Sequence, residues 1–444
     1  MQPTRGTCRR KAFVGVEWAI LACVFLFCLT GACLLPFEQC PDEGERLKLT
    51  RWIIDHAALP TGNEPELIIE NWGFSYATRP YLSSIIGAVF AKCAGLITES
   101  QRAALLGARM CSVLSVTGCC AFCLLLGKRL FEKRSSARLF AVLVCFLPQV
   151  LFLGMYQNND ALSLFGVSML LYTLVGGWDN HWSIGWCAAV GVSMAVCLLS
   201  YYTVYGWLLL AIVFCIATCR SDPRIDHKGS FILKRGLLIF AVAFCVAGWH
   251  FIRTACHHNM DFLGMSAELI AKSNTEAQRL GFQCAYDMGY SFTYMCAYDN
   301  FMWFRKSIKS FIGVFGNMRY YAPPIVYYAY FAIFIGGAIA YLFNAVRTRS
   351  EKGRWPLLLL LVASSASCVA VSLLQSYFRD FQAQGRYIIT CILSLAYMLA
   401  RALDCVKTRD HSLLRRLQPQ YILAAVWILL CACMAAYTMA RILC

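Results

Sequence analysis

The residues best suited to chemistry in this 444-residue chain lie in the stretch Cys40-Pro41-Asp42-Glu43-Gly44-Glu45. This stretch follows the first apolar run and carries three carboxylates within four positions. A carboxylate beside a membrane helix can act as a general base, and two adjacent carboxylates can hold a divalent cation. Acids in such places also serve simply to keep a loop in water. No second acidic cluster with the spacing of a metal cage is evident, so we favour a base, with Asp42 in that role and Glu43 as its neighbour.

A second acid, Asp160, stands in the short connection Tyr156-Gln157-Asn158-Asn159-Asp160-Ala161-Leu162 between two apolar runs. Its carboxylate could cap the following helix by accepting hydrogen bonds from free backbone N–H groups. The neighbouring Asn158 and Asn159 favour a functional interpretation, because their amides supply the hydrogen bonds that orient a sugar.

A basic motif, Gln382-Ala383-Gln384-Gly385-Arg386-Tyr387, opens a late apolar run. Arginine at a helix N-terminus suits a phosphate, since the guanidinium binds two oxygens and the backbone N–H groups add further donors. The alternative is an arginine that reaches toward the membrane surface without binding anything. The coincidence of Gly385, Arg386 and Tyr387 favours a site.

Two further segments carry weaker signals. The cluster Trp72, Phe74, Tyr76, Arg79 and Tyr81 suits either an aromatic belt at the membrane surface or a carbohydrate platform with Arg79 as phosphate ligand. Arg319, which ends Gly313-Val314-Phe315-Gly316-Asn317-Met318-Arg319, could meet an anionic head group. The pair His257-His258 is a poor metal site, because adjacent side chains on a helix point apart and a third ligand is missing.

The composition of the chain indicates the class of protein to which these residues belong. Hydrophobic residues make up 59% of the chain and charged residues only 14%, with a mean hydropathy of +0.57. Soluble domains carry about a quarter charged residues, so repeated long apolar runs predict an all-α polytopic membrane protein. The net charge of +16 then reflects basic cytoplasmic loops, not a nucleic-acid partner. Most of the 25 cysteines sit in apolar runs, which argues against a disulfide framework; pairing of Cys284 with Cys296 stays open.

The apolar runs predict 11 spans in a single domain over 1–444. They lie at about 12–35, 103–126, 137–155, 161–177, 183–199, 203–219, 233–252, 321–344, 356–376, 387–404 and 420–442. Two long outer segments are expected, 36–102 and 253–320. The first should hold an amphipathic interfacial helix that ends near Pro60, followed by a re-entrant or interfacial helix at 81–97.

The basic residues set the expected orientation. Segments assigned to the cytoplasm hold 23 of the 40 Lys and Arg residues, as the positive-inside rule requires. This topology puts the N-terminus in the cytoplasm and places Asp42, Asp160 and Arg386 on the outer side together.

Five motifs now stand in order: Pro41-Asp42-Glu43, Asn158-Asn159-Asp160-Ala161-Leu162, Trp249-His250-Phe251-Ile252-Arg253, the 313–318 stretch followed by Pro323-Pro324, and Gln384-Gly385-Arg386-Tyr387. Over about 36–390 this order resembles the bacterial membrane-protein family called domain of unknown function 2142, which is similar to the GT-C glycosyltransferases. The resemblance implies a GT-C fold in a bacterial plasma membrane, a sugar donor on a polyprenyl phosphate or diphosphate, and a glycan or lipid acceptor outside the cytoplasm.

The resemblance also assigns roles to individual residues. It implies Asp42 as base with Glu43 beside it, and Asp160 as a second acid. It implies that Arg386 holds the lipid phosphate, with Arg79 or Arg319 secondary. Further substrate contacts are expected from three neighbours of these motifs, Gln384, Tyr387 and Asn159. The family pattern leads us to expect an aromatic residue where Asn317 stands, so that contact is in doubt.

No cofactor is expected to be obligatory, although a divalent metal at Asp42 and Glu43 stays open. Other functions also stay open: a carrier or flippase for a lipid-linked saccharide or another solute, a glycan polymerase, or a non-catalytic scaffold. Carriers place ionisable residues near the middle of the membrane. Here the acids and the arginine gather at one outer surface, which favours an enzyme.

Overall fold

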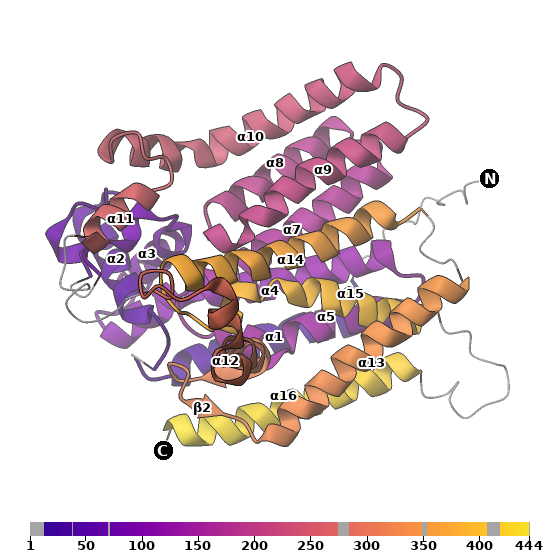
Figure 1. The fold of residues 1–444 in the computed structure, drawn as a ribbon. Helices are drawn as coiled ribbons and strands as arrows, with labels where there is room; N and C mark the ends of the chain where they lie inside the picture. The colour runs from indigo at the N-terminus through magenta and orange to yellow at the C-terminus, as the bar shows by residue number, and fades with distance from the viewer. Residues whose placement is uncertain are drawn as a thin grey trace.

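The computed structural model describes residues 13–37, 39–69, 72–273, 284–348, 353–405 and 418–443. Within these ranges the chain is almost entirely helical, and two short antiparallel strands form the only sheet (Figure 1). The first part of the chain contains α1 (Gly15–Leu34), α2 (Glu43–His56), η1 (Pro65–Leu67), η2 (Tyr76–Thr78), α3 (Leu82–Gly95), α4 (Gln101–Leu130), α5 (Arg134–Cys145), α6 (Pro148–Leu153), α7 (Asp160–Asp179) and α8 (Ile184–Leu198). The second part contains η3 (Tyr202–Val204), α9 (Tyr205–Ser221), α10 (Lys228–His257), α11 (Met265–Ser273), α12 (Phe292–Gly313), β1 (Val314–Phe315), β2 (Tyr320–Tyr321), α13 (Pro324–Thr348), α14 (Trp355–Phe378), η4 (Gly385–Ile388), α15 (Cys391–Asp404) and α16 (Pro419–Leu443).

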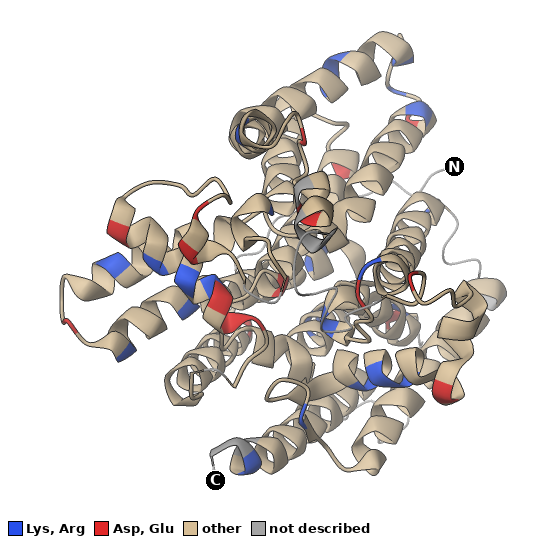
Figure 2. Cartoon of the chain, turned by 60° about the vertical axis from the view of Figure 1, so that its left-hand side comes forward, with Lys and Arg blue, Asp and Glu red and all other residues tan. Residues whose placement is uncertain are grey.

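The prediction of an all-α polytopic membrane protein is confirmed. Among the described residues, eight helices are long and apolar enough to cross a membrane. They lie where eight of the predicted spans were placed, and they include the two 30-residue helices α4 and α10. Most of the ribbon in Figure 2 is uncharged, which agrees with the low content of acidic and basic residues.

The other three predicted spans are shorter than expected. The run 137–155 is divided into α5 and α6 because Pro148 lacks the N–H that a continuous helix needs. The run 387–404 begins with the 3-10 turn η4 and leaves α15 with 14 residues, and α8, in the run 183–199, has 15. At 1.5 Å per residue, α15 and α8 are about 21–23 Å long and α5 is about 18 Å long, all less than the roughly 30 Å hydrocarbon core.

The segment 36–102 contains both expected short helices. The amphipathic helix is α2, which buries Leu47, Leu49 and Thr50 and exposes Lys48. The helix expected at 81–97 is α3, a 14-residue apolar helix too short to span by itself. It packs closely on α4, where a Cβ on Gly107 would overlap the backbone of Ala91.

The helix ends divide into two groups. Figure 1 shows α2, α3, α11 and β2 gathered at one end of the bundle, whereas the link between α9 and α10 lies at the other end. At that other end, Glu17 of α1 is buried and paired with Lys128 of α4 and Arg138 of α5. The short connections that carry the predicted site residues therefore come together at one end.

Candidate active site

The turn before α2 and the 3-10 turn η4 meet at this end. Asp42 places its Oδ2 atom 2.7 Å from Nη2 of Arg386. The backbone of Asp42 is left-handed, with φ of 60°, a conformation that Asp tolerates better than most residues. Burial acts to raise the pKa of Asp42, but the guanidinium groups of Arg386 and Arg46 hold that pKa below its ordinary value. The expected base and the expected phosphate ligand are thus brought into contact.

Gly385 sets the position of Arg386. A Cβ at this glycine would overlap the backbone of Ser307 and Phe311 in α12. The Gly385 N–H donates to Ser310 Oγ at 2.6 Å. Only glycine allows η4 to approach α12 this closely, so packing explains the glycine that precedes the arginine.

Arg386 keeps donor capacity that the described part of the chain does not use. Its side chain is 6% exposed, and Nη2 also donates to the Tyr387 hydroxyl at 2.9 Å. The Tyr387 O–H in turn donates to Gln382 Oε1. Within the described ranges, Nε of Arg386 and Oε1 of Gln384 are buried without a hydrogen-bond partner. A buried donor left unsatisfied costs about 1–3 kcal/mol, so an anionic ligand oxygen would stabilise this arrangement.

Glu43 occupies a different environment from Asp42. Its side chain is fully buried, and both of its oxygens lie 2.8 Å from the guanidinium of Arg109 in α4. Arg109 also donates to the carbonyls of Ala32 and Leu35, and the Gln157 N–H donates to Glu43. This buried ion pair ties α1, α2 and α4 together. Its geometry favours a framework role for Glu43 over the catalytic role predicted from the sequence.

The same geometry bears on the metal expected at Asp42 and Glu43. The two carboxylates face different arginines, so a cation shared between them would have to displace both guanidinium groups. In the described part of the chain, no group of three or more His, Cys, Asp or Glu side chains is arranged to hold a metal ion. The two cysteines for which pairing was left open, Cys284 and Cys296, are both free thiols.

The two asparagines in the connection before α7 both form hydrogen bonds within the protein. Asn158 Oδ1 accepts from the Ala161 N–H at 2.8 Å, so Asn158 performs the capping role considered for Asp160. Asn159 donates to the Pro80 carbonyl at 3.0 Å and accepts from the Ser83 hydroxyl. Because both ends of its amide bind the start of α3, Asn159 joins two segments of the framework. This placement does not favour the sugar contact expected for it.

Asp160 is the first residue of α7 and is buried. Within the described residues, its carboxylate makes no hydrogen bond or ion pair. It lies within electrostatic range of Arg386, Arg46 and Asp42. The structure therefore brings the two predicted acids, Asp42 and Asp160, to the same arginines.

Arg46 is a member of this site that the sequence analysis did not single out. It lies one helical turn after Asp42, and its guanidinium is 5.0 Å from the centre of the Tyr76 ring. Arg46 is 6% exposed, its Nε has no hydrogen-bond partner, and no ion pair joins it to any other described residue. The signal that could have identified it is its place on the predicted amphipathic helix, four positions, or about one helical turn, after Asp42.

Arg79 faces the same ring from a second segment. Its guanidinium lies 5.0 Å from the Phe74 ring and 5.6 Å from the Tyr76 ring. It forms an ion pair with Glu268 of α11 at 2.6 Å, and Glu268 also pairs with Arg379 at 3.4 Å. Arg79 is thus beside the site, but a carboxylate of the protein occupies its donors.

Asn317 and Arg319 lie in the turn between β1 and β2, and both are exposed. Gly316 begins this turn with φ of 58°, and a Cβ there would overlap the Tyr320 ring. No hydrogen bond or ion pair in the described structure joins the Arg319 side chain to the cluster around Asp42. The structure brings together Asp42, Asp160, Arg46, Arg79 and Arg386, but not Arg319.

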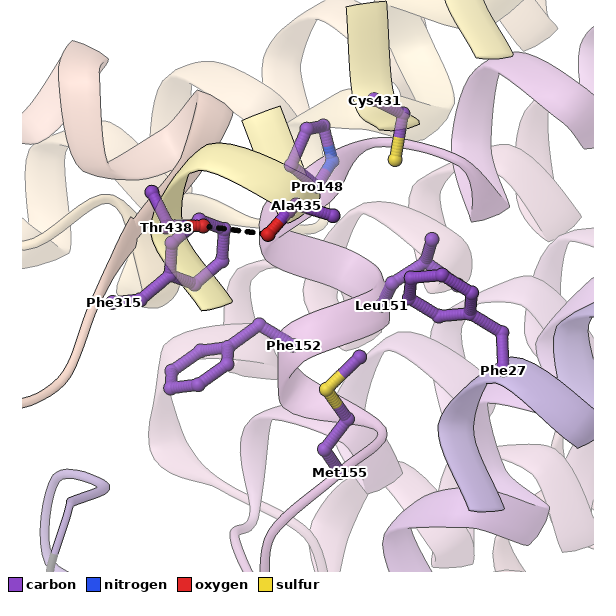
Figure 3. A pocket seen from close by; sticks show the side chains of 9 residues that line it. All are labelled: Phe27, Pro148, Leu151, Phe152, Met155, Phe315, Cys431, Ala435 and Thr438. Carbon is purple, nitrogen blue, oxygen red and sulfur yellow. Dashed lines mark hydrogen bonds between the residues drawn. The ribbon is translucent and has the colours of Figure 1, made fainter. Parts of the chain in front are cut away.

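An apolar pocket lies between α1, α6, β1 and α16 (Figure 3). It is small, with about 20 Å³ of water-accessible volume, which is room for about one water molecule. The residues that line it are Phe27, Pro148, Leu151, Phe152, Met155, Phe315, Cys431, Ala435 and Thr438. The Phe152 ring packs 5.1 Å from that of Tyr156, which begins the connection to Asp160. The pocket therefore adjoins the segment that leads to the site.

The fold is shared with known GT-C glycosyltransferases. The structure of ArnT from Cupriavidus metallidurans bound to undecaprenyl phosphate is similar, with a TM-score of 0.57 and 15% sequence identity over 93% of this chain and 64% of that one. The oligosaccharyltransferase of Archaeoglobus fulgidus tethered with an acceptor peptide is similar with a TM-score of 0.56 and 12% identity, over 95% of this chain and 55% of that one. The oligosaccharyltransferase AglB from Archaeoglobus fulgidus, in complex with an inhibitory peptide and a dolichol-phosphate, gives a TM-score of 0.51 and 11% identity over 96% of this chain and 56% of that one.

These structures extend beyond the region that they share with this protein. The chain spans less than two thirds of the length of each of them. At such low identities the likeness establishes the fold alone. No curated protein matches the sequence.

A family model does match. The model described as a predicted membrane protein, DUF2142, aligns with residues 70–395. That range includes Arg79, Asp160 and Arg386 and covers most of the chain. The protein belongs to the DUF2142 family of membrane proteins.

Proposed function

We propose that this protein is an inverting GT-C glycosyltransferase. It would move a sugar from a polyprenyl-phosphate or polyprenyl-diphosphate donor to a glycan or lipid of the cell envelope. The observation that carries the proposal is the 2.7 Å contact between Asp42 and Arg386, which unites a potential base with a potential phosphate ligand. The GT-C fold supports the general class of reaction.

The donor phosphate would bind where Arg386 and Arg46 leave buried donors without partners. Arginine binds phosphate oxygens through two N–H groups at once. As Arg386 turns its donors to the phosphate, its hold on Asp42 weakens. The pKa of the Asp42 carboxylate then rises, and this group becomes a better proton acceptor.

In the transfer step, Asp42 accepts the proton of the acceptor hydroxyl. The acceptor oxygen forms a bond to the anomeric carbon as the bond from that carbon to the phosphate oxygen breaks. The electron pair of the broken bond remains on the phosphate, where the guanidinium groups stabilise the growing negative charge. Displacement from the opposite face inverts the configuration. Asp42 is 31% exposed, whereas Glu43 is fully buried, so Asp42 is the carboxylate that an acceptor can reach.

We place the isoprenoid chain of such a donor along the apolar surface into which the small pocket beside α6 opens. Its lining is almost entirely hydrocarbon and sulfur, with Thr438 as the one hydroxyl-bearing residue among the nine. The Thr438 hydroxyl already donates to the Met434 carbonyl at 2.7 Å.

The orientation follows from the charges of the connecting loops. We place the N-terminus in the cytoplasm and the Asp42 site on the outer face of a bacterial plasma membrane, since the basic residues favour the opposite end. Accessibility labelling of single cysteines near residues 60 and 130 in intact cells would test this orientation.

The direct test is sugar transfer by the full-length protein in lipid nanodiscs. The donors are a panel of synthetic undecaprenyl-phosphoryl and undecaprenyl-diphosphoryl sugars, and the acceptors are extracted envelope glycans and lipids. We expect product with the wild type and strongly reduced turnover with Asp42→Asn and Arg386→Ala. Equal turnover in all three proteins would reject the assignment, and movement of donor across liposome membranes without product would favour a flippase.

A further inference from the structure

Glu268 is a buried carboxylate that the proposed mechanism does not use. It projects from the nine-residue helix α11 and is 2% exposed. Its Oε1 lies 2.6 Å from Nη2 of Arg79, and its Oε2 lies 3.3 Å from Nε of Arg79 and 3.4 Å from Nη1 of Arg379. One carboxylate is thus shared by two guanidinium groups.

The two arginines come from segments that border the site. Arg79 ends the turn η2, and Arg379 follows α14, six positions before Gly385. Arg79 shares the Tyr76 ring with Arg46, and its charge contributes to lowering the pKa of Asp42. The position held by Glu268 is therefore next to the proposed phosphate position.

The geometry at Arg79 is that of an oxyanion site. Two N–H groups of one guanidinium face two oxygens of one anion, an arrangement that suits phosphate as well as carboxylate. A phosphate would bring more charge and a further oxygen for Arg379. The carboxylate of Glu268 consequently occupies a place where a phosphate group of a ligand would fit.

The attachment of α11 is compatible with its displacement. Leu269 is 51% exposed and Ile270 60%, so the helix does not bury these apolar side chains. Just before α11, the Tyr202 hydroxyl donates to the Leu263 carbonyl, and Gly264 lies against the Thr78 carbonyl. Glu268 is the buried polar anchor among the described side chains of α11.

We propose that Arg79 and Arg379 form an anion site for a phosphate group of the lipid-linked donor. Glu268 holds this site closed, and the donor opens it by replacing the carboxylate, which releases α11. This proposal rests on the proposed function, because it assigns a position to the second phosphate of a diphosphate donor. A diphosphate can bind at both positions at once, whereas a monophosphate can bind at one.

The test measures binding, so it does not depend on sugar transfer. Farnesyl phosphate, farnesyl diphosphate and inorganic pyrophosphate are titrated against the full-length protein in nanodiscs. We expect Glu268→Gln to bind farnesyl diphosphate about tenfold more tightly than the wild type, because the internal competitor is removed. The gain should be smaller for farnesyl phosphate and should vanish in the double variant Glu268→Gln/Arg379→Gln. Glu99→Gln, which changes an exposed acid outside the cluster, should bind as the wild type does.

Hydrogen–deuterium exchange keeps the proposal testable even when Glu268→Gln folds poorly. In the wild type, farnesyl diphosphate should accelerate amide exchange in 265–270. Unchanged exchange there, or weaker binding by a well-folded Glu268→Gln variant, would overturn the anion site and assign Glu268 to structure alone. Pyrophosphate that reproduces the effect would show that the phosphates suffice without the lipid. If the protein transfers sugar but Glu268→Gln does not change diphosphate binding, only this proposal is refuted. If Glu268→Gln tightens diphosphate binding but the protein transfers no sugar, only the proposed glycosyltransferase activity is refuted.

Discussion

Asp42 and Glu43 are adjacent in the chain, yet their carboxylates bind different arginines from distant segments. Asp42 contacts Arg386 at 2.7 Å and remains partly exposed, whereas Glu43 is buried against Arg109 at 2.8 Å. The start of α2 separates them, because Asp42 adopts a left-handed conformation just before the helix and Glu43 is its first residue. The two carboxylates therefore differ in environment: that of Asp42 is partly open to a ligand, and that of Glu43 is enclosed by the protein.

The first prediction concerns the base. Asp42→Asn removes the proton acceptor but keeps the size of the side chain, so we expect turnover to fall by about 10²–10⁴-fold while donor binding is retained. Steady-state transfer rates and donor affinity measured side by side will check this. Asp55→Asn is a matched control, since Asp55 is an exposed acid on the same helix. Turnover within twofold of the wild type would exclude Asp42 as the base.

The second prediction concerns the framework. Glu43→Gln leaves Arg109 as a buried charge without its carboxylate, which should cost about 3–5 kcal/mol of stability. Thermal unfolding in detergent should show a clear drop in Tm. The double variant Glu43→Leu/Arg109→Met removes both charges and should recover part of that loss. A Tm unchanged in Glu43→Gln would contradict the framework role.

The third prediction concerns phosphate binding. Arg46→Ala and Arg386→Ala each remove hydrogen bonds to a charged group, worth about 1.5–3 kcal/mol. We expect donor KM to rise by roughly ten- to a hundredfold in each variant. The control is Arg51→Ala, which removes an exposed arginine of α2. Arg46→Ala with the KM of the wild type would show that its position in the site has no part in donor binding.

The fourth prediction concerns pH. Since the pKa of Asp42 is depressed in the folded protein by Arg386, its ionised form stabilises the fold above its ordinary pKa of 3.8. This stabilisation is lost as pH falls below 3.8 and passes through the depressed pKa of the folded state. The difference in Tm between the wild type and Asp42→Asn should therefore be constant near neutral pH and should disappear in strong acid. A difference that persists in strong acid would need another cause.

The membrane class and most spans were predictable because each depends on a local property. A run of apolar residues long enough to cross the hydrocarbon core specifies a helix by itself. Eight spans were found in this way, and Pro148 explains locally why the run 137–155 is broken. The sequence also singled out Asp42, Asp160 and Arg386, because charged residues are few in such a chain and stand out at helix ends.

In contrast, only the tertiary structure decided which side chains pair with one another in ion pairs and hydrogen bonds. Nothing local shows that Arg109 reaches Glu43, that Glu268 occupies Arg79, or that Asn159 binds the start of α3. These contacts join segments that are 66, 189 and 79 positions apart. Residue types and charge patterns thus determined which groups were present and at which end of the helices. Helix packing decided which of them meet, because ion pairs and hydrogen bonds depend on distances that only the folded chain sets.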